Sequence, residues 1–491
     1  MPLNLISDPW IPVLDTAGQR RIIAPWQMAE PGLLRPDWPR PDLNIACLEL
    51  LIGLVFLADP PEDVEDWQDR QAPDPDRLRD RLAPLAPAFN LTGEGPLFLQ
   101  DFVPLQDAPN PPDMLFIDSA GANTAKNNAD LMVRRGRYAA LNLPLAAMAL
   151  YAFQAHAPLG GAGNRTSMRG GGPLVTLVDP GAELWPLIWA NVPDGLAQGV
   201  ATLPWMRPTR VSDTGLQVFP PPGHGIGAET FFGMPRRLRL VVAEDAATGV
   251  IQRPWGTNYA GWEHPLTPYY RQKAGTELLP VHPRAGRFGY RHWLGILAEM
   301  RDPEAGLRQR ARVLRLRQAR GGGGSVIVAG WAMDNMKPRD FIQSVQPFVA
   351  LERERAMLLA GLIEAAEQAG LALRMALKPL MGDSEAREAE REAFYTDTEA
   401  GFQARLRDIQ AGRAGADVAA DWLAELRRVA LARFDARALP GLDQLETDVI
   451  ARIVTAQRFL AGCFKGYGKY GSEMFGKLGL TLPAKTKKVV T

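Results

Sequence analysis

The spacing of apolar and polar residues divides the chain into two regions. In residues 1–348, short apolar runs alternate with loops rich in proline and glycine, a pattern typical of a mixed domain of buried helices and short strands. In residues 349–466, proline nearly disappears and apolar residues recur every three or four positions, which indicates amphipathic helices. The sequence therefore predicts an α+β fold, with a large mixed N-terminal domain followed by a C-terminal helical domain.

The C-terminal domain is predicted to be an antiparallel four-helix bundle. Its helices should span residues 351–378, 384–409, 417–434 and 442–460. The last three each carry a single apolar stripe and the connections are short, as in such bundles. We expect a structural or protein-docking role for this domain. Residues 467–491 are rich in glycine and lysine and are predicted to form a mobile tail that can touch nucleic acid.

In the first domain, rigid elements are predicted on both sides of the most glycine-rich stretch. Residues 42–57 and 141–155 are predicted to be helices, and residues 173–178 a strand. Residues 159–173 follow the second helix and have the sequence LGGAGNRTSMRGGGP. We call residues 157–173 the glycine-rich segment. Because a helix precedes it and a strand follows it, we predict that the segment is a loop held at both ends and not a free linker.

The glycine-rich segment combines six glycines with Arg165 and Arg169. Glycine adopts positive φ angles easily and lets a ligand approach the bare backbone. Exposed backbone N–H groups and guanidinium donors both suit phosphate. Arg165 and Arg169 are therefore candidate phosphate contacts, and a flexible surface loop is the alternative.

A second candidate is the polar stretch 122–137, which lies between apolar segments. Its basic and amide side chains include Lys126, Asn127, Asn128, Arg134 and Arg135. The basic side chains suit phosphates and the amides suit base edges. A solvated loop is the alternative.

Two further stretches are candidates for contacts with nucleic acid. Between residues 258 and 275, aromatic residues are interleaved with cations, which suits base stacking but equally a core beside exposed charges. Residues 334–337 precede Pro338, which would end any helix, so we expect a tight turn that displays Asn335. An ordinary surface turn is the alternative there.

Composition narrows the possible functions. Lys and Arg number 55, as do Asp and Glu, so a basic surface must be local. The two cysteines and five histidines show no metal-ligand spacing, so we expect neither a metal nor another cofactor. No apolar run is long enough for a membrane span and no signal peptide is recognisable, so a cytoplasmic location is expected. Because P-loop and nucleophile-elbow motifs are absent as well, the sequence favours binding over catalysis.

Four motifs, in the same order along nearly the whole chain, resemble the CasA-type large subunit of the type I-E CRISPR surveillance complex, Cascade. They are Asp8-Pro-Trp-Ile-Pro-Val, residues 157–173, residues 330–339 and Ala393-Phe-Tyr. The resemblance implies a subunit without catalytic activity that recognises the protospacer-adjacent motif of double-stranded DNA, starts strand separation and helps recruit a helicase–nuclease. Its implied partners are the other Cascade subunits, the guide RNA and the target DNA, with no membrane.

The resemblance also implies site residues in this chain. Those for reading the motif from the minor groove are Gly160, Gly161, Ala162, Gly163 and Lys273, with Gln272 as the alternative to Lys273. The wedge under the first base pair corresponds to Asp334, Asn335 and Met336. The loop 122–137 would lie near the motif and the guide, with Met132 where relatives can have an aromatic residue. A function of another class stays open: a nucleotide-binding enzyme whose residues 160–172 cradle a phosphate.

Overall fold

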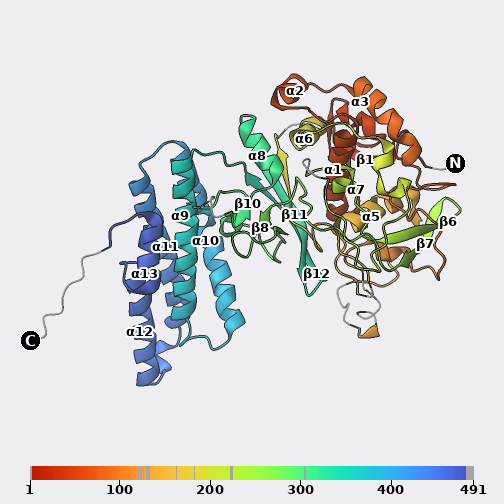
Figure 1. The fold of residues 1–491 in the computed structure, drawn as a ribbon. Helices are drawn as coiled ribbons and strands as arrows, with labels where there is room; N and C mark the ends of the chain where they lie inside the picture. Colours follow the sequence, from red (N-terminus) through yellow and green to blue (C-terminus); the bar gives the residue numbers. More distant parts are fainter. Residues whose placement is uncertain are drawn as a thin grey trace, which may run out of the picture. The chain divides into compact units, whose positions relative to one another are not determined.

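The computed structural model describes residues 3–482, except residues 120, 122–123, 125, 129–132, 162, 182, 222–224 and 303–305. The chain forms two compact units: residues 1–287 with 310–348, and residues 288–309 with 349–491. The predicted α+β class with a helical C-terminal region is confirmed (Figure 1). Residues 288–309, however, cluster with the second unit, whereas the sequence analysis placed them in the first domain.

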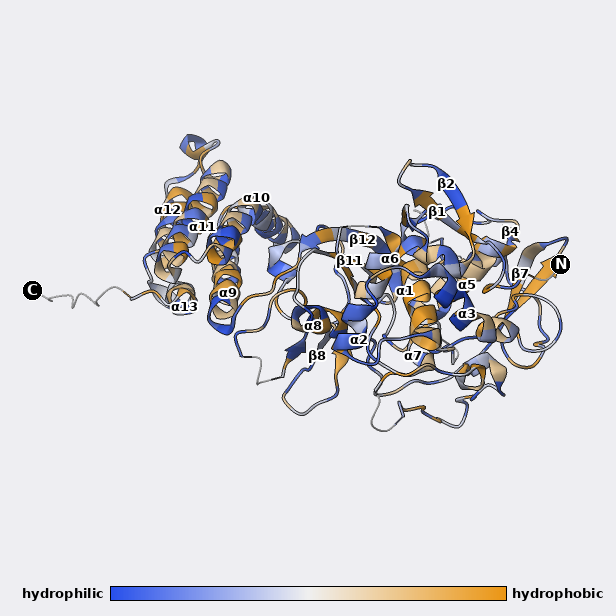
Figure 2. Ribbon diagram, turned by 90° about the horizontal axis from the view of Figure 1, so that it is seen from above, coloured by the Kyte–Doolittle hydropathy of each residue, from blue (hydrophilic) through white to orange (hydrophobic). Residues whose placement is uncertain are grey.

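The first unit is built around α1 (Pro41–Ala58), which is apolar on nearly all sides (Figure 2). A helix with this composition is stable only when it is buried. Two helices, α1 and α9 (Arg353–Ala376), are long and apolar enough to cross a membrane, but 89% of α1 is buried inside the structure, as in a core helix. The other described helices of this unit are α2 (Val64–Asp69), α3 (Pro75–Leu82), α5 (Leu143–His156), α6 (Leu184–Ala190), α7 (Ala228–Phe232) and α8 (Arg312–Ala319).

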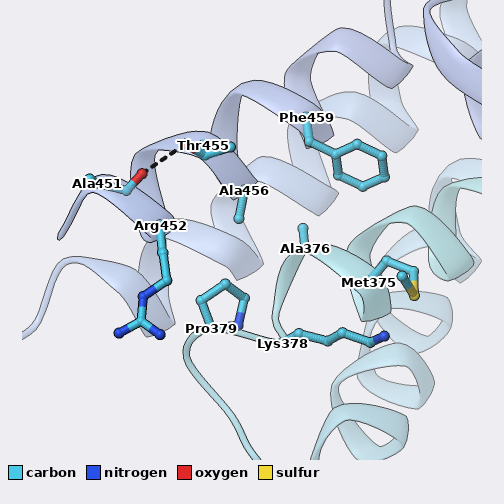
Figure 3. Close-up of a pocket in the computed structure, with 9 residues that line it drawn as sticks. All are labelled: Met375, Ala376, Lys378, Pro379, Ala451, Arg452, Thr455, Ala456 and Phe459. Carbon is cyan, nitrogen blue, oxygen red and sulfur yellow. Dashed lines mark hydrogen bonds between the residues drawn. The ribbon is translucent and has the colours of Figure 1, made fainter. Parts of the chain in front are cut away.

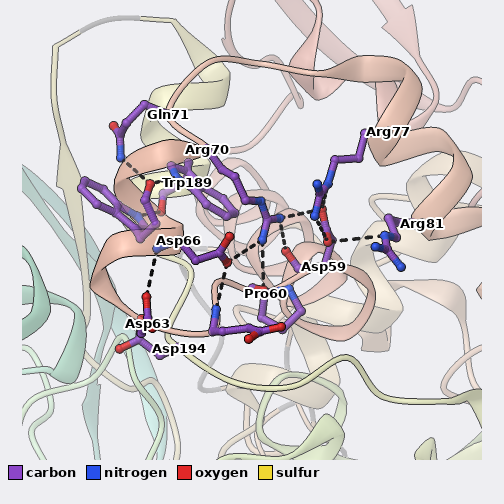
Figure 4. Close-up of polar contacts among 12 residues, drawn as sticks. Asp59, Pro60, Asp63, Asp66, Arg70, Gln71, Arg77, Arg81, Trp189 and Asp194 are labelled. Atoms are coloured by element: carbon purple, nitrogen blue, oxygen red, sulfur yellow. Dashed lines mark hydrogen bonds and ion pairs between the residues drawn. The ribbon is translucent and has the colours of Figure 1, made fainter.

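Ion pairs fix the C-terminal end of α1. Asp59, directly after the helix, accepts hydrogen bonds from Arg70 and Arg77, and its carboxylate lies 3.6 Å from the Nε of Arg81 (Figure 4). The guanidinium of Arg70 also lies over the ring of Trp189, 4.8 Å from the centroid. One carboxylate shared by three arginines therefore ties α1 to α2 and α3.

The strands of the first unit form small antiparallel sheets. The first contains β1 (Ile11–Asp15), β2 (Arg20–Ile23) and β3 (Leu33–Pro36), and the second β4 (Leu141–Asn142), β6 (Arg237–Ala243) and β7 (Ala246–Arg253). The third has the order β12-β11-β5, with β5 (Val175–Asp179), β11 (Ser325–Asp334) and β12 (Lys337–Pro347). A further pair joins β8 (Tyr269–Tyr270) to β9 (Leu279–Pro280).

The β11–β12 hairpin extends beyond the third strand of its sheet. β5 pairs with β11 only from Ser325 to Ala329, whereas β12 pairs with β11 up to Asp334. Only the first half of β11 is therefore paired on both of its edges. Because β5 stops short, residues 330–334 and their partners on β12 form a two-stranded ribbon that ends in the turn at Asn335 and Met336.

The second unit contains the four predicted bundle helices and two additions. The four are α9, α10 (Ser384–Gln410), α11 (Gly415–Ala438) and α12 (Thr447–Cys463). Residues 288–309, which include β10 (Arg308–Gln309), join this unit because Tyr290 stacks on the buried Phe402 at 4.3 Å between ring centroids. The predicted mobile tail from residue 467 is wrong for α13 (Gly468–Leu478), which packs on α9; residues 483–491 lie outside the described residues.

A buried ion pair connects α1 to the glycine-rich segment. Glu49, fully buried in the middle of α1, accepts hydrogen bonds from Arg169 Nη1 at 2.9 Å and Nη2 at 2.7 Å. His156, the last residue of α5, places its Nε2 3.2 Å from the same carboxylate. The start and the end of the glycine-rich loop are therefore both fixed to one acidic side chain in the core.

The charges at this site favour ionised Glu49. Burial by itself raises the pKa of a carboxyl group, but the charges and hydrogen bonds of Arg169 and His156 outweigh it and hold the pKa of Glu49 well below its usual range. Burial likewise opposes the charged form of Arg169, and the carboxylate of Glu49 overcomes that effect and raises the pKa of Arg169. The pair is charged on both sides at neutral pH.

Glu49→Gln should lower the free energy of unfolding by about 3–5 kcal/mol at pH 7, because it leaves the buried guanidinium of Arg169 without its counter-ion. Urea unfolding followed by tryptophan fluorescence measures this, since most tryptophans lie in the first unit. The exposed Glu94→Gln is the control and should change stability by less than about 0.5 kcal/mol.

The same comparison has a pH dependence with a defined sign. A carboxyl group whose pKa is lower in the folded than in the unfolded state stabilises the fold above its unfolded pKa of about 4.3. The stability difference between the parent chain and Glu49→Gln should therefore be constant from pH 8 to about pH 5 and should shrink as the pH falls further. A difference that instead grows on acidification would contradict this assignment.

Candidate nucleic-acid interface

Backbone hydrogen bonds close the glycine-rich segment into a loop on the end of α5. Ser167 N donates to Ala157 O at 3.0 Å, and Gly172 N donates to His156 O at 3.1 Å. Ser167 and Arg169 are buried, whereas Gly160 and Gly161 are exposed. The segment therefore has a fixed base and an exposed tip, and the flexible-loop alternative does not describe its base.

The last three glycines of the segment are close-packed rather than open. A Cβ on Gly170 would lie 2.8 Å from the ring of His282, and one on Gly171 would lie 2.6 Å from Pro158 Cα. A Cβ on Gly172 would collide with the carbonyl oxygen of Trp331. These glycines are needed for packing between neighbouring elements, so they leave no space in which to cradle a phosphate.

At the exposed tip, Gly161 differs from its neighbours. A Cβ on Gly160 would lie 2.8 Å from Arg236 Nη1, and one on Gly163 would lie 2.7 Å from the ring of Trp255. Gly161 has a φ of +66° and nothing within 4 Å of its added Cβ. It is thus the glycine at which the backbone faces open space. Ala162 lies outside the described residues.

The predicted turn at residues 334–336 is the tip of the β11–β12 hairpin. Asn335 and Met336 have φ angles of +48° and +61°, which define a type I′ turn between Asp334 and Lys337. Asp334 accepts hydrogen bonds from Asn335 Nδ2 at 3.0 Å and from Arg339 Nη2 at 2.8 Å. Left-handed backbone is unfavourable for methionine, so the exposed Met336 is held there at a cost in local energy.

Lys273 lies in the loop between β8 and β9. Its backbone is fixed by Thr276, whose Oγ1 donates to Lys273 O at 2.8 Å and accepts from Lys273 N at 3.3 Å. Lys273 and Gln272 are both exposed, and the ammonium of Lys273 has no ion-pair partner among the described residues. A fixed backbone with a free ammonium group suits contact with an anionic ligand.

The close-packed glycines bring the predicted site elements together. The hairpin that carries Lys273 continues from β9 into His282, whose Nδ1 lies 3.2 Å from Gly172 O. A Cβ on Gly171 would lie 3.3 Å from Met336 Sδ. Burial lowers the pKa of His282, so it is neutral here at pH 7. The end of the β8–β9 hairpin and the tip of the β11–β12 hairpin thus both lie close to residues 170–172.

The two predicted phosphate contacts have different outcomes. The prediction for Arg169 is wrong in this structure, because its guanidinium is buried and bonded to Glu49. Arg165 stays a prediction: it is half-buried, donates to Ser212 Oγ at 2.9 Å and lies over Trp255, 5.3 Å from the ring centroid. Trp255 was not among the predicted site residues, because its contacts with Arg165 and Gly163 form only on folding and no local motif encodes them.

The loop at residues 122–137 is only partly described. Its described candidates are all exposed: Lys126, Asn127, Asn128, Arg134 and Arg135. The side chain of Arg135 donates to Asn128 Oδ1 at 3.1 Å. Met132 lies outside the described residues. The role of this loop near the motif and the guide stays a prediction.

The helical second unit has an open surface depression with a mainly apolar lining. It has a cavity volume of about 490 Å³ and lies between the end of α9 and α12 (Figure 3). Its lining comprises Met375, Ala376, Lys378, Pro379, Ala451, Arg452, Thr455, Ala456 and Phe459. This mainly apolar lining includes the cationic side chains of Lys378 and Arg452.

Comparisons with known proteins place the chain in a family. The sequence matches the family described as CRISPR-associated protein Cse1 over residues 4–432. A comparison with curated proteins gave no match. Among solved structures, CasA of Thermus thermophilus has a TM-score of 0.72 at 19% identity, covering 94% of this chain and 100% of that chain.

Two further structures show the same fold. Cse1 of Acidimicrobium ferrooxidans has a TM-score of 0.68 at 18% identity, covering 98% of this chain and 99% of its own. A chain of a structure titled CRISPR RNA-guided surveillance complex has a TM-score of 0.68 at 17% identity, covering 94% and 99%. The resemblance seen in the sequence motifs is confirmed: the chain belongs to the CRISPR-associated Cse1 family, also called CasA.

Proposed function

We propose that the chain is the large subunit of a type I-E CRISPR RNA-guided surveillance complex in the cytoplasm, with the other subunits and the guide RNA as partners. It recognises a short motif in double-stranded DNA from the minor groove, opens the adjacent base pair and helps recruit a helicase–nuclease. It needs no catalytic group for these steps. The observation that carries the proposal is that His282, after the β8–β9 hairpin, and Met336, at the tip of the β11–β12 hairpin, both lie close to residues 170–172, in the same segment as the exposed Gly161.

The properties of the minor groove fit these elements. The groove is narrow and presents a degenerate pattern of acceptors, so a bare backbone at Gly161 and one cation at Lys273 can read it with limited selectivity. Opening a base step costs a few kcal/mol, which an inserted side chain offsets by filling the gap. Met336 and Asn335, on a stiff ribbon, suit that role. Selectivity beyond the motif is then left to base pairing with the guide.

The alternative function, a nucleotide-binding enzyme, is less well supported. Residues 170–172 are filled by neighbouring side chains and Arg169 is bonded to Glu49, so half of the proposed phosphate cradle is closed. The two functions are separated by calorimetry on the isolated chain with ATP and GTP. Micromolar affinity for a nucleotide without other subunits would favour the enzyme.

Gly161→Asp should weaken binding of motif-bearing duplex by the reconstituted complex at least tenfold, about 1.4 kcal/mol. Aspartate tolerates left-handed backbone, so the loop should keep its shape while an acidic side chain occupies the space that the duplex needs. Electrophoretic mobility shift with a fixed salt concentration measures the change.

The control for this variant is Gly181→Asp. Gly181 is also exposed, has a φ of +77° and has nothing within 4 Å of an added Cβ, but it follows β5 rather than α5. It should bind duplex normally. Equal effects of the two substitutions, or normal binding by Gly161→Asp, would show that the exposed glycine is not the contact.

Lys273→Ala should weaken duplex binding and lower the slope of log Kd against log salt concentration by about 0.9, because one cation no longer releases a counter-ion. Gln272→Ala carries no charge change and should leave the slope unaltered. Duplex-binding titrations over a several-fold range of salt concentration show whether Lys273 or Gln272 makes the contact. A loss of affinity confined to Gln272→Ala would assign the contact to the amide.

Met336→Gly should raise the free energy of unfolding by about 1 kcal/mol, because glycine relieves the left-handed strain at this position, while it impairs duplex opening. Fluorescence of 2-aminopurine beside the motif reports the opening. Higher stability combined with weaker opening is the expected signature of a strained side chain that acts as a wedge.

Another type I′ turn, at the β6–β7 hairpin, supplies a matched control. Glu244 and Asp245, between β6 and β7, have φ angles of +50° and +62°. Glu244→Gly should stabilise the fold to a similar extent, because glutamate, like methionine, is unfavourable in left-handed backbone, and it should leave duplex opening unchanged. Unimpaired opening by Met336→Gly would remove Met336 from the wedge and leave only Asn335 as its candidate.

A further inference from the structure

Arg236, directly before β6, is a buried arginine without a carboxylate partner. Its residue surface is only 4% exposed, and no Asp or Glu among the described residues pairs with it. The neighbouring Arg237, by contrast, donates from Nε to Asp101 Oδ2 at 2.6 Å. Arg236 Nη2 donates to Pro158 O, its Nε is buried without a partner, and its guanidinium lies 5.3 Å from the ring centroid of Phe153.

This guanidinium lies directly behind the exposed tip of the glycine-rich segment. Its Nη1 and Nη2 would be 2.8 and 3.1 Å from a Cβ on Gly160. Only glycine at this position lets the backbone lie so close to the cation. The hydrogen bond to Pro158 O attaches the same guanidinium to the residue where the segment leaves its base.

A role in packing alone does not explain a charge at this place. Buried arginines are almost always paired, because an unpaired charge in the interior is costly, and methionine would fill a similar volume without that cost. Burial lowers the pKa of Arg236 to about 10, so the group is still protonated at neutral pH. The field of this cation is weakly screened, because protein rather than water surrounds it.

The backbone next to it provides a matching donor. Gly160 N donates to Asn164 O at 3.4 Å and Gly161 O accepts from Asn164 N at 2.8 Å. Gly161 N has no hydrogen-bond partner among the described residues, and Gly161 is exposed. A free N–H on the residue after the glycine that covers an uncompensated cation is an arrangement that attracts an oxyanion.

We propose that Arg236 and the N–H of Gly161 form a phosphate-binding site, and that its ligand is one phosphodiester group of the target duplex beside the recognised motif. The buried cation attracts the phosphate through the thin layer of glycine backbone, while Gly161 N–H makes the direct hydrogen bond. Arg236 is thus a positioning residue for the DNA backbone. This inference rests on the proposed function and adds a contact of the exposed glycine with one phosphate at the edge of the groove that it reads.

The test compares Arg236→Met with the parent chain in the reconstituted complex. Because the substitution removes an unpaired buried charge, the melting temperature should stay the same or rise. The affinity for motif-bearing duplex should fall, and the slope of log Kd against log salt concentration should fall by about 0.9, the value for one phosphate. Arg236→Lys keeps the charge and should restore most of the slope.

Duplexes with a single neutral methylphosphonate identify the phosphate itself. A methylphosphonate at one position should weaken duplex binding by the parent complex. The same duplex should bind the Arg236→Met complex no more weakly than the unmodified duplex does. Arg317→Met is the control, because burial also lowers the pKa of Arg317, which lies on α8. The Arg317→Met complex should still bind more weakly to the duplex with a methylphosphonate at that position. An equal effect of Arg317→Met would overturn the assignment to the glycine-rich segment.

The outcomes separate this inference from the proposed function. If Arg236→Met keeps both affinity and salt slope while Gly161→Asp loses binding, the phosphate site is wrong and the proposed function stands. If neither variant loses binding, the proposed function fails with it. A loss of affinity that follows a lower melting temperature and is not restored by Arg236→Lys would make Arg236 a purely structural residue.

Discussion

The arrangement of the candidate interface depends on the buried carboxylate of Glu49. In water-like surroundings an ion pair contributes little, whereas in the interior the loss of either partner leaves an uncompensated charge. His156 and Arg169 lie at the two ends of the loop formed by residues 157–168, and both contact this carboxylate. The tip of the glycine-rich segment can therefore be exposed and short of contacts without losing its position, because its base is attached to the central helix of the unit.

This anchor divides the glycines of the segment into two kinds. Residues 170–172 lack side chains because other residues occupy that space, and substitution there would disturb the fold. Gly161 faces solvent, so an added side chain meets no neighbour there, and its φ of +66° favours glycine, aspartate and asparagine over other residues. Glycine content alone suggests one continuous anion-binding loop, whereas the packing around residues 170–172 leaves only the first half of the segment open to a ligand.

Sequence periodicity predicted the parts of the fold that depend on local pattern. The bundle helices and the helix–loop–strand frame of the glycine-rich segment follow from residue spacing within each element. Three errors have one cause, which is contact between residues distant in sequence. Arg169 is 120 positions from Glu49, Tyr290 packs on Phe402, and glycine-rich α13 is helical because α9 covers it. Arg236 was missed for the same reason, since its contact with residues 158–160 is made only by folding.

The unequal lengths of the strands in the β12-β11-β5 sheet have a mechanical consequence. β5 begins at Val175, opposite Ala329, and the residues just before it, Gly172 and Pro173, belong to the glycine-rich segment. The segment therefore lies beside the ribbon in place of a third strand, with Trp331 and Met333 against it. These contacts couple the two parts mechanically. A force on the turn at Met336 would act on the base of the loop through the packing of Trp331 and Met333 against Gly172.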